Sequence, residues 1–249
     1  MIEVERKFVL SDMKSTTSIE SKLVDLGMAK KEEAYMVDWY FDLHVPTLTP
    51  LDNWLRYREV LGKGASWQLK KGQRHEGGVT VYEEIEGVEA VQQALSSISW
   101  KTGKSSSKPV SEYEGRHVPE LPDPTCGLMP FCRIETRRTS WSYPNGDSSA
   151  IAVDLDVTNF GYMVGEVEIV VETMEGVQDA RQRIEEFLRF LVPSQALHEE
   201  TAVGKLEHYL MAHRPEYYRA CVESGSILAK PLIASSSDGV HLQEDYHVP

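Results

Sequence analysis

Charged side chains recur at every second position in several stretches of the chain that otherwise have the composition of β-strands. In residues 2–10, Glu3, Glu5 and Lys7 share one face of the expected strand, because side chains alternate in direction along a strand. The opposite face is largely apolar. The same alternation recurs in residues 150–157. A sheet of such strands has one ionic and one apolar face, and the apolar face must be covered by other elements.

The ionic face can look either at solvent or into a closed interior. In an open soluble sheet it would be the solvated face. Here the charges are sorted, since one strand carries the pair Asp154 and Asp156 and another carries Arg56 and Arg58. If the sheet closes and helices cover its outside, these faces point inward. Such an interior must hold water, mutual ion pairs and ligands of both signs, because uncompensated burial costs several kcal/mol per ion. We therefore predict a barrel with helices packed outside.

The local sequence patterns predict an α+β chain with hairpin-like connections, which makes about eight or nine strands. Strand-like stretches lie at residues 2–10, 28–35, 37–43, 54–61, 66–71, 79–86, 131–139, 141–143, 150–157 and 165–173. Apolar residues at helical spacing predict helices at residues 17–26, 88–98, 177–191 and 202–212. Another short helix follows Pro215. Thr17 and Glu20 have the spacing of a capping box. Two sequence features predict tight turns: the glycines at positions 62 and 64, and the pair Asn145-Gly146.

Length and composition favour a single domain. A chain of 249 residues with 41% hydrophobic content can bury one substantial core. We place this domain in residues 1–222. Residues 223–249 contain a serine run and scattered charge, and we expect them to form a disordered tail. Residues 101–125 are rich in serine, proline, glycine and lysine, which indicates a surface excursion.

The charge and the cysteines restrict partners and location. A net charge of −13 would repel a nucleic-acid backbone, so we expect no such partner, and phosphate-binding groups must be concentrated locally. The three cysteines form no CxxC pair and are odd in number, which favours unpaired thiols in a reducing, cytoplasmic location. There is no run of 18 apolar residues and no signal-peptide core, so we expect neither membrane insertion nor secretion. We expect a monomer.

The residue types on the ionic faces indicate a class of chemistry. Clustered carboxylates without cysteine or histidine are hard oxygen ligands that suit Mg²⁺ or Mn²⁺. Arginines offer forked donors that match phosphate oxygens, and lysines add point charges. Together these groups fit phosphoryl transfer, in which a protein mainly positions the reacting groups and neutralises charge.

Several motifs resemble those of a known superfamily. The run from Glu3 to Lys7 matches the Glu-x-Glu-x-Lys signature of the CYTH, or triphosphate tunnel metalloenzyme, superfamily. In order and spacing the chain is most similar to the eukaryotic thiamine triphosphatases, over residues 1–220. The motifs that accompany the signature are Trp54-Leu-Arg56-Tyr-Arg58, Gln68-Leu-Lys70, Arg137-Arg138, Val153-Asp-Leu-Asp156, Asn159-Phe-Gly-Tyr162, Gly165-Glu-Val-Glu168 and Lys205.

The resemblance implies a closed antiparallel barrel of eight strands, a tunnel that holds triphosphate, and Mg²⁺-dependent hydrolysis of thiamine triphosphate to thiamine diphosphate and phosphate. It implies that phosphate is bound by Lys7, Arg56, Arg58, Lys70, Arg138 and Lys205. It assigns the metal to Glu3, Glu5, Asp154 and Glu168, and shares Glu166 between metal and substrate as a catalytic residue. It also pairs Tyr40 with Lys70 in activating water.

Trp54 bears most directly on substrate choice. It shares a strand face with Arg56 and Arg58, so its ring could stack on the cationic thiamine group, and the alternative is a core tryptophan. Within the superfamily, the rival activities are hydrolysis of inorganic tripolyphosphate or nucleoside triphosphates, and adenylate cyclisation of the class IV type. A non-catalytic polyphosphate-binding barrel is a rival of another kind.

Overall fold

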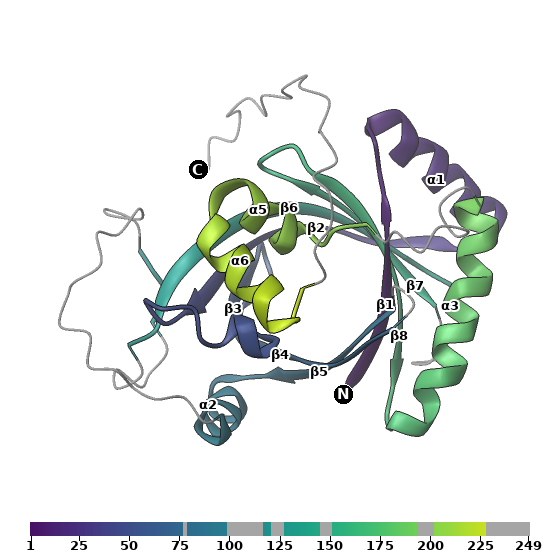
Figure 1. Ribbon diagram of the computed structural model, residues 1–249. Helices are drawn as coiled ribbons and strands as arrows, with labels where there is room; N and C mark the ends of the chain where they lie inside the picture. Colours follow the sequence, from purple (N-terminus) through teal and green to yellow (C-terminus); the bar gives the residue numbers. More distant parts are fainter. Residues whose placement is uncertain (77–78, 99–116, 121–126, 145–150, 194–201, 228–249) are drawn as a thin grey trace.

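The strands form a closed barrel in the computed structural model, which describes residues 1–76, 79–98, 117–120, 127–144, 151–193 and 202–227. Among these residues, eight antiparallel strands follow one another in the order β1-β5-β4-β3-β2-β6-β7-β8 (Figure 1). Because β1 pairs with both β5 and β8, the sheet has no free edge. The strands are β1 (Ile2–Val9), β2 (Ala29–Asp42), β3 (Asn53–Val60), β4 (Gly64–Glu76), β5 (Val79–Glu86), β6 (Met129–Ser142), β7 (Ala152–Thr158) and β8 (Met163–Val171).

Helices cover the outside of the barrel. Helices α1 (Met13–Asp25) and α3 (Val177–Leu191) lie together beside β1 and β8 (Figure 1). Their apolar sides and the outward faces of the strands form one buried cluster, which includes Val4, Phe8, Leu23, Val167, Ile184 and Leu188. Gly165 lies directly under Phe8, since a Cβ there would come within 2.0 Å of the Phe8 ring. The apolar face of the charged strands is thus buried under helices, as the alternation predicts.

Further helices complete the cover on the outside of the barrel. Helix α2 (Val88–Ser97) packs against β4 and β5, where Val91 and Leu95 join a buried cluster with Trp67. The short helix η1 (Thr49–Leu51) contacts α6 (Pro215–Ser224), and α6 in turn contacts α5 (Lys205–His213). The short helix η3 (Met174–Gly176) precedes α3. With the outside covered, the ionic faces point into the barrel, which confirms the predicted α+β fold with helices outside.

In two places, a pair of strands predicted from the sequence is one long strand in the structure. Strand β2 runs through the expected break at residue 36, and β6 runs through the expected break at residue 140. The two strands pair along most of their length, with irregularities at residues 30–32 and 40–41. Such irregularities let a strand bend without leaving the sheet. The prediction of separate strands was wrong at these two places.

The first helix begins earlier than its sequence pattern predicts. Asp12 is the N-cap, because its side chain accepts a hydrogen bond of 2.7 Å from the Ser15 backbone N–H. The Ser15 hydroxyl lies 3.1 Å from the Asp12 backbone N–H and accepts its hydrogen bond, which completes a capping box. Thr17 lies inside the helix and donates to the Met13 carbonyl. The predicted capping box at Thr17 was therefore wrong.

Other predictions have mixed outcomes. Gly62 and Gly64 have positive φ angles of 77° and 109°, which confirms the turn between β3 and β4. The described residues do not include the turn at 145–146, most of residues 101–125, Cys126 or residues 228–249.

The packed part of the chain extends beyond residue 222, because Ile227 is buried. Cys132 and Cys221 are both buried. In the described part of the chain, no helix has both the length and the apolar character needed to cross a membrane.

Candidate active site

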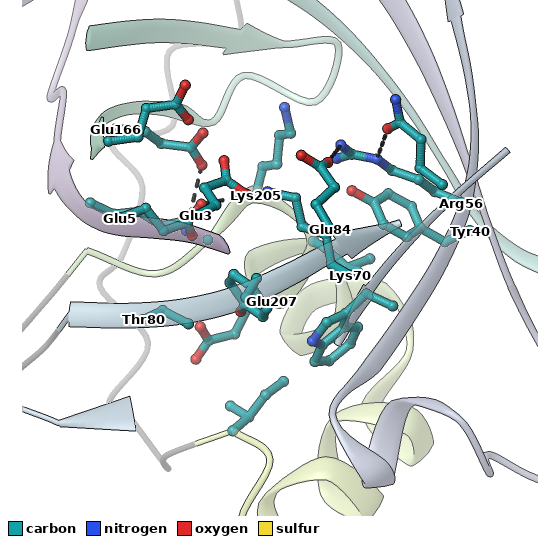
Figure 2. A pocket seen from close by; sticks show the side chains of 18 of the residues that line it. Glu3, Glu5, Tyr40, Arg56, Lys70, Thr80, Glu84, Glu166, Lys205 and Glu207 are labelled. Atoms are coloured by element: carbon teal, nitrogen blue, oxygen red, sulfur yellow. Dashed lines mark hydrogen bonds and ion pairs between the residues drawn. The ribbon is translucent and has the colours of Figure 1, made fainter. Parts of the chain in front are cut away.

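The barrel encloses a cavity of about 410 Å³, within the usual range of roughly 300–1,000 Å³ for small-molecule sites. All but one of the site residues predicted from the sequence line it. They are Glu3, Glu5, Lys7, Tyr40, Trp54, Arg56, Arg58, Lys70, Arg138, Glu166, Glu168 and Lys205. Figure 2 shows Glu3, Glu5 and Glu166 on one side of the cavity and Arg56 and Tyr40 on the other. The strands therefore bring acidic and basic groups together around a shared interior.

Two arginines on β3 are held by side chains from other strands of the barrel. Arg58 makes a forked pair with Asp38, with N–O distances of 2.6 and 2.7 Å, and Asp38 has no exposed surface. Arg56 donates to Gln68 at 2.7 Å and to Glu84 at 3.2 Å (Figure 2). Burial alone would lower the pKa of Arg56, but nearby acids, Asp38 foremost, raise it. Both guanidinium groups are thus fixed and charged, as phosphate recognition requires.

Asp156 fixes two further cations. Its carboxylate accepts two hydrogen bonds from Arg138, at 2.6 and 2.7 Å, and one of 2.7 Å from Lys205. Asp154 also pairs with Arg138 and accepts a 2.6 Å hydrogen bond from the Ser140 hydroxyl. Both oxygens of Asp154 are engaged in this way, and it is the one predicted site residue that does not line the cavity.

Glu3 and Glu168 form the most suitable pair for a divalent cation. Burial and the neighbouring Glu3 raise the pKa of Glu168 well above its usual value. Burial opposes ionisation of Glu3 as well, but Lys70 outweighs it and lowers the pKa of Glu3 to about 2. The two neighbouring carboxyl groups therefore resist being ionised together. Hard carboxylate oxygens held this close fit Mg²⁺, which would favour the doubly ionised pair.

The other acidic candidates have cationic partners, as Glu3 has in Lys70. Glu5 contacts Lys7, and Glu166 lies 3.6 Å from Lys7 and 3.0 Å from Arg138. Burial opposes ionisation of Glu166, but these cations hold its pKa well below the usual value. In the described part of the chain, no three acidic, histidine or cysteine side chains converge as a ready metal site. Glu168, which stands beside Glu3, is therefore the better-fitting ligand, and Asp154 fits least well.

The structure does not favour Lys70 as a base. Its ammonium lies 2.5 Å from Glu3 and 3.6 Å from Glu5. Burial alone would lower the pKa of Lys70, but these two carboxylates raise it. Burial, followed by the charge of Asp38, raises the pKa of Tyr40 to about 12. A lysine that acts as a general base near neutral pH needs a lowered pKa, which is the opposite of the shift found for Lys70. The arrangement therefore suits Lys70 to binding phosphate rather than to accepting a proton.

Several residues of the site were not assigned a role from the sequence. Asp38 and Asp156 are fully buried acids behind the arginines, and Tyr82 lies under Lys70 with 5.4 Å between the ammonium and the ring centre. Glu84 reaches Arg56 from β5. Asp38 shares a strand face with Tyr40, which is the one signal that could have pointed to it.

Comparisons with known proteins agree with this geometry. The sequence profile of the CYTH domain matches residues 1–202. The chain is 30% identical over 245 residues to a Homo sapiens protein named thiamine-triphosphatase, and 29% identical to a Macaca fascicularis protein of the same name, with 96% of both chains covered in each case. A solved structure from Pyrococcus horikoshii OT3 superposes with a TM-score of 0.53 at 15% identity, covering 85% of this chain and 99% of that one, which shows the shared fold. The chain belongs to the CYTH domain family.

Proposed function

We propose that this protein hydrolyses the terminal phosphoanhydride of thiamine triphosphate, giving thiamine diphosphate and phosphate. The observation that carries the proposal is the convergence of six lysine and arginine side chains on one cavity that also holds an acidic pair and a tryptophan. A triphosphate with an organic group is a ligand that would use all three. The names of the relatives that are about 30% identical support the choice of thiamine triphosphate.

In this proposal the cations bind and neutralise the phosphate chain. Arg56 and Arg58 hold it from β3, Arg138 holds it from β6 and Lys205 holds it from the start of α5. Their buried partners fix the guanidinium groups before substrate arrives, so little reorganisation is needed as charge develops on the leaving diphosphate. Lys70 acts as a further phosphate-binding cation. Glu166 is ionised and can accept a hydrogen bond from the attacking water.

The acidic side of the cavity would hold Mg²⁺, with Mn²⁺ as a substitute. Glu3 and Glu168 are the proposed first ligands, and Glu5 is close enough on β1 to join them. When bound, the metal would neutralise negative charge on the phosphate chain.

A substrate panel tests the proposed function. With Mg²⁺ and equal concentrations of thiamine triphosphate, inorganic tripolyphosphate and ATP, we expect kcat/KM to be about tenfold or more higher for thiamine triphosphate, the size of effect that one ring contact supplies. The measurement is phosphate release, with chromatography of the organic product. Equal turnover of tripolyphosphate, or cyclic nucleotide and pyrophosphate from ATP, would identify one of the rival activities. No turnover of any substrate would favour a non-catalytic binder.

Trp54 accounts for the preference in this proposal, so Trp54→Ala should reduce it. Loss of a cation–π contact worth about 0.5–2 kcal/mol should lower the ratio of kcat/KM for thiamine triphosphate over tripolyphosphate about tenfold. The matched variant Trp54→Phe keeps an aromatic face but has no indole N–H, so it should lower the ratio less than Trp54→Ala does. If Trp54→Ala reduces turnover of both substrates equally, the ring is structural.

A further inference from the structure

Asp52 stands in an unusual backbone conformation immediately before β3. It ends the short helix η1, and its φ and ψ angles of 56° and 36° are left-handed. Among the described residues it is the only one other than glycine with a positive φ. Aspartate tolerates this region better than most residues, but the conformation still carries a cost and needs support from its surroundings.

That support comes from Gly72 on β4. The Gly72 backbone N–H donates a 2.8 Å hydrogen bond to the Asp52 carbonyl, and the Asp52 N–H donates to the Thr49 carbonyl at 3.0 Å. The Asp52 carboxylate lies directly over Gly72, because a Cβ at that position would come within 1.4 Å of the Asp52 Oδ2 atom. Only glycine leaves room for the carboxylate, and the strand register is irregular just beyond it, between Gly72 and Arg74.

The carboxylate is aimed at the ring that lines the cavity. The Trp54 indole N–H donates a 2.8 Å hydrogen bond to Asp52 Oδ1. Trp54 stands opposite Lys70 across β3 and β4, and both line the cavity. A hydrogen bond from an indole N–H to an anion fixes the ring plane and increases the electron density of the ring, and both effects strengthen its attraction for a cation.

The geometry points to Asp52 as a positioning residue that holds the Trp54 ring for a triphosphate whose organic group is planar and cationic. This inference rests on the proposed function and extends it. Asp52 acts through Trp54, so it should affect the choice of substrate rather than the hydrolytic step, and Gly72 should matter only because it leaves space for the Asp52 carboxylate.

Kinetics of three variants test the inference. Asp52→Ala should lower the ratio of kcat/KM for thiamine triphosphate over tripolyphosphate about three- to tenfold, chiefly through KM, because the ring loses its orientation. Asp52→Asn keeps an oxygen acceptor and should recover most of the ratio. Gly72→Ala should resemble Asp52→Ala. The control is Glu83→Ala, which removes one negative charge on the outer face of β5, where Glu83 pairs with Lys71, and should leave the ratio unchanged.

A double-mutant cycle distinguishes positioning from an independent effect. In a Trp54→Phe background, which has no indole N–H, Asp52→Ala should change the ratio less than twofold. If the effects of the two substitutions multiply, Asp52 acts independently of the ring and the inference is wrong. If Asp52→Ala lowers kcat/KM equally for both substrates, or has no effect on either, its role is structural and the inference is also wrong.

A measurement without substrate separates this inference from the proposed function. The Trp54 indole N–H signal in a ¹H–¹⁵N spectrum can be assigned by its loss in Trp54→Phe. It should shift upfield and exchange faster with solvent in Asp52→Ala, but not in Glu83→Ala. An unchanged signal would overturn the positioning role. A changed signal in a protein that shows no preference for thiamine triphosphate would instead overturn the proposed function.

Discussion

Glu168→Gln should reduce Mg²⁺-dependent turnover of thiamine triphosphate by about 10²- to 10³-fold, the size of loss that follows removal of one electrostatic contact to a transition state. The amide has nearly the shape of the carboxyl group but cannot carry the charge that holds a divalent cation beside Glu3. Folding should not suffer, because the amide removes a like-charge repulsion with Glu3. The measurement is phosphate release over a range of Mg²⁺ concentrations.

The matched control is Glu172→Gln, which makes the same chemical change at an exposed position just beyond β8. It should leave turnover unchanged. A second readout does not depend on catalysis, since Mg²⁺ should raise the midpoint of thermal unfolding of the unaltered protein and of Glu172→Gln but not of Glu168→Gln. Full turnover with an unchanged Mg²⁺ dependence in Glu168→Gln would exclude Glu168 as a metal ligand.

The barrel could be predicted from the sequence because charged and apolar residues are separated so strictly onto opposite faces of its strands. Alternation in β1, β7 and β8 places ions on one face and apolar residues on the other, and the helical spacing of α3 gives its bounds as observed. The length of β2 and β6 could not be predicted. Local sequence shows where a strand weakens, but only pairing between the two strands carries each of them through an irregularity.

The lining of the site was largely predictable, whereas its support was not. Each predicted lining residue except Lys205, which begins α5, is a charged or aromatic side chain at strand period, so its face follows from its own strand. The counter-ions follow from pairing between strands: Asp38 lies opposite Arg58 and Asp156 lies opposite Arg138 only in the observed register. Asp154 pairs with Arg138 and does not line the cavity, which the alternation of β7 alone could not show.

Asp38→Asn should lower the free energy of unfolding by about 3–5 kcal/mol, because removing one partner of a buried ion pair leaves the other charge uncompensated. Asp38 has no exposed surface, and its two oxygens are both used by Arg58. The KM for thiamine triphosphate and for tripolyphosphate should rise together, since Arg58 loses its orientation. Urea unfolding measures the first effect. Glu33→Gln, at an exposed position on the same strand, is the control and should change stability little.

The contribution of Asp38 to stability should depend on pH, and the direction follows from the shift of its pKa. Burial alone would raise the pKa of Asp38, but the Arg58 charge and its hydrogen bonds hold it below the usual value. The ion pair therefore contributes to stability above about pH 4, the unfolded value of an aspartate, and the contribution is lost as the pH falls toward the lower folded-state pKa. The difference in stability between the unaltered protein and Asp38→Asn should shrink on acidification below pH 4. A difference that stays constant down to the lowest pH at which the protein remains folded would show that packing, rather than the Asp38 charge, is responsible.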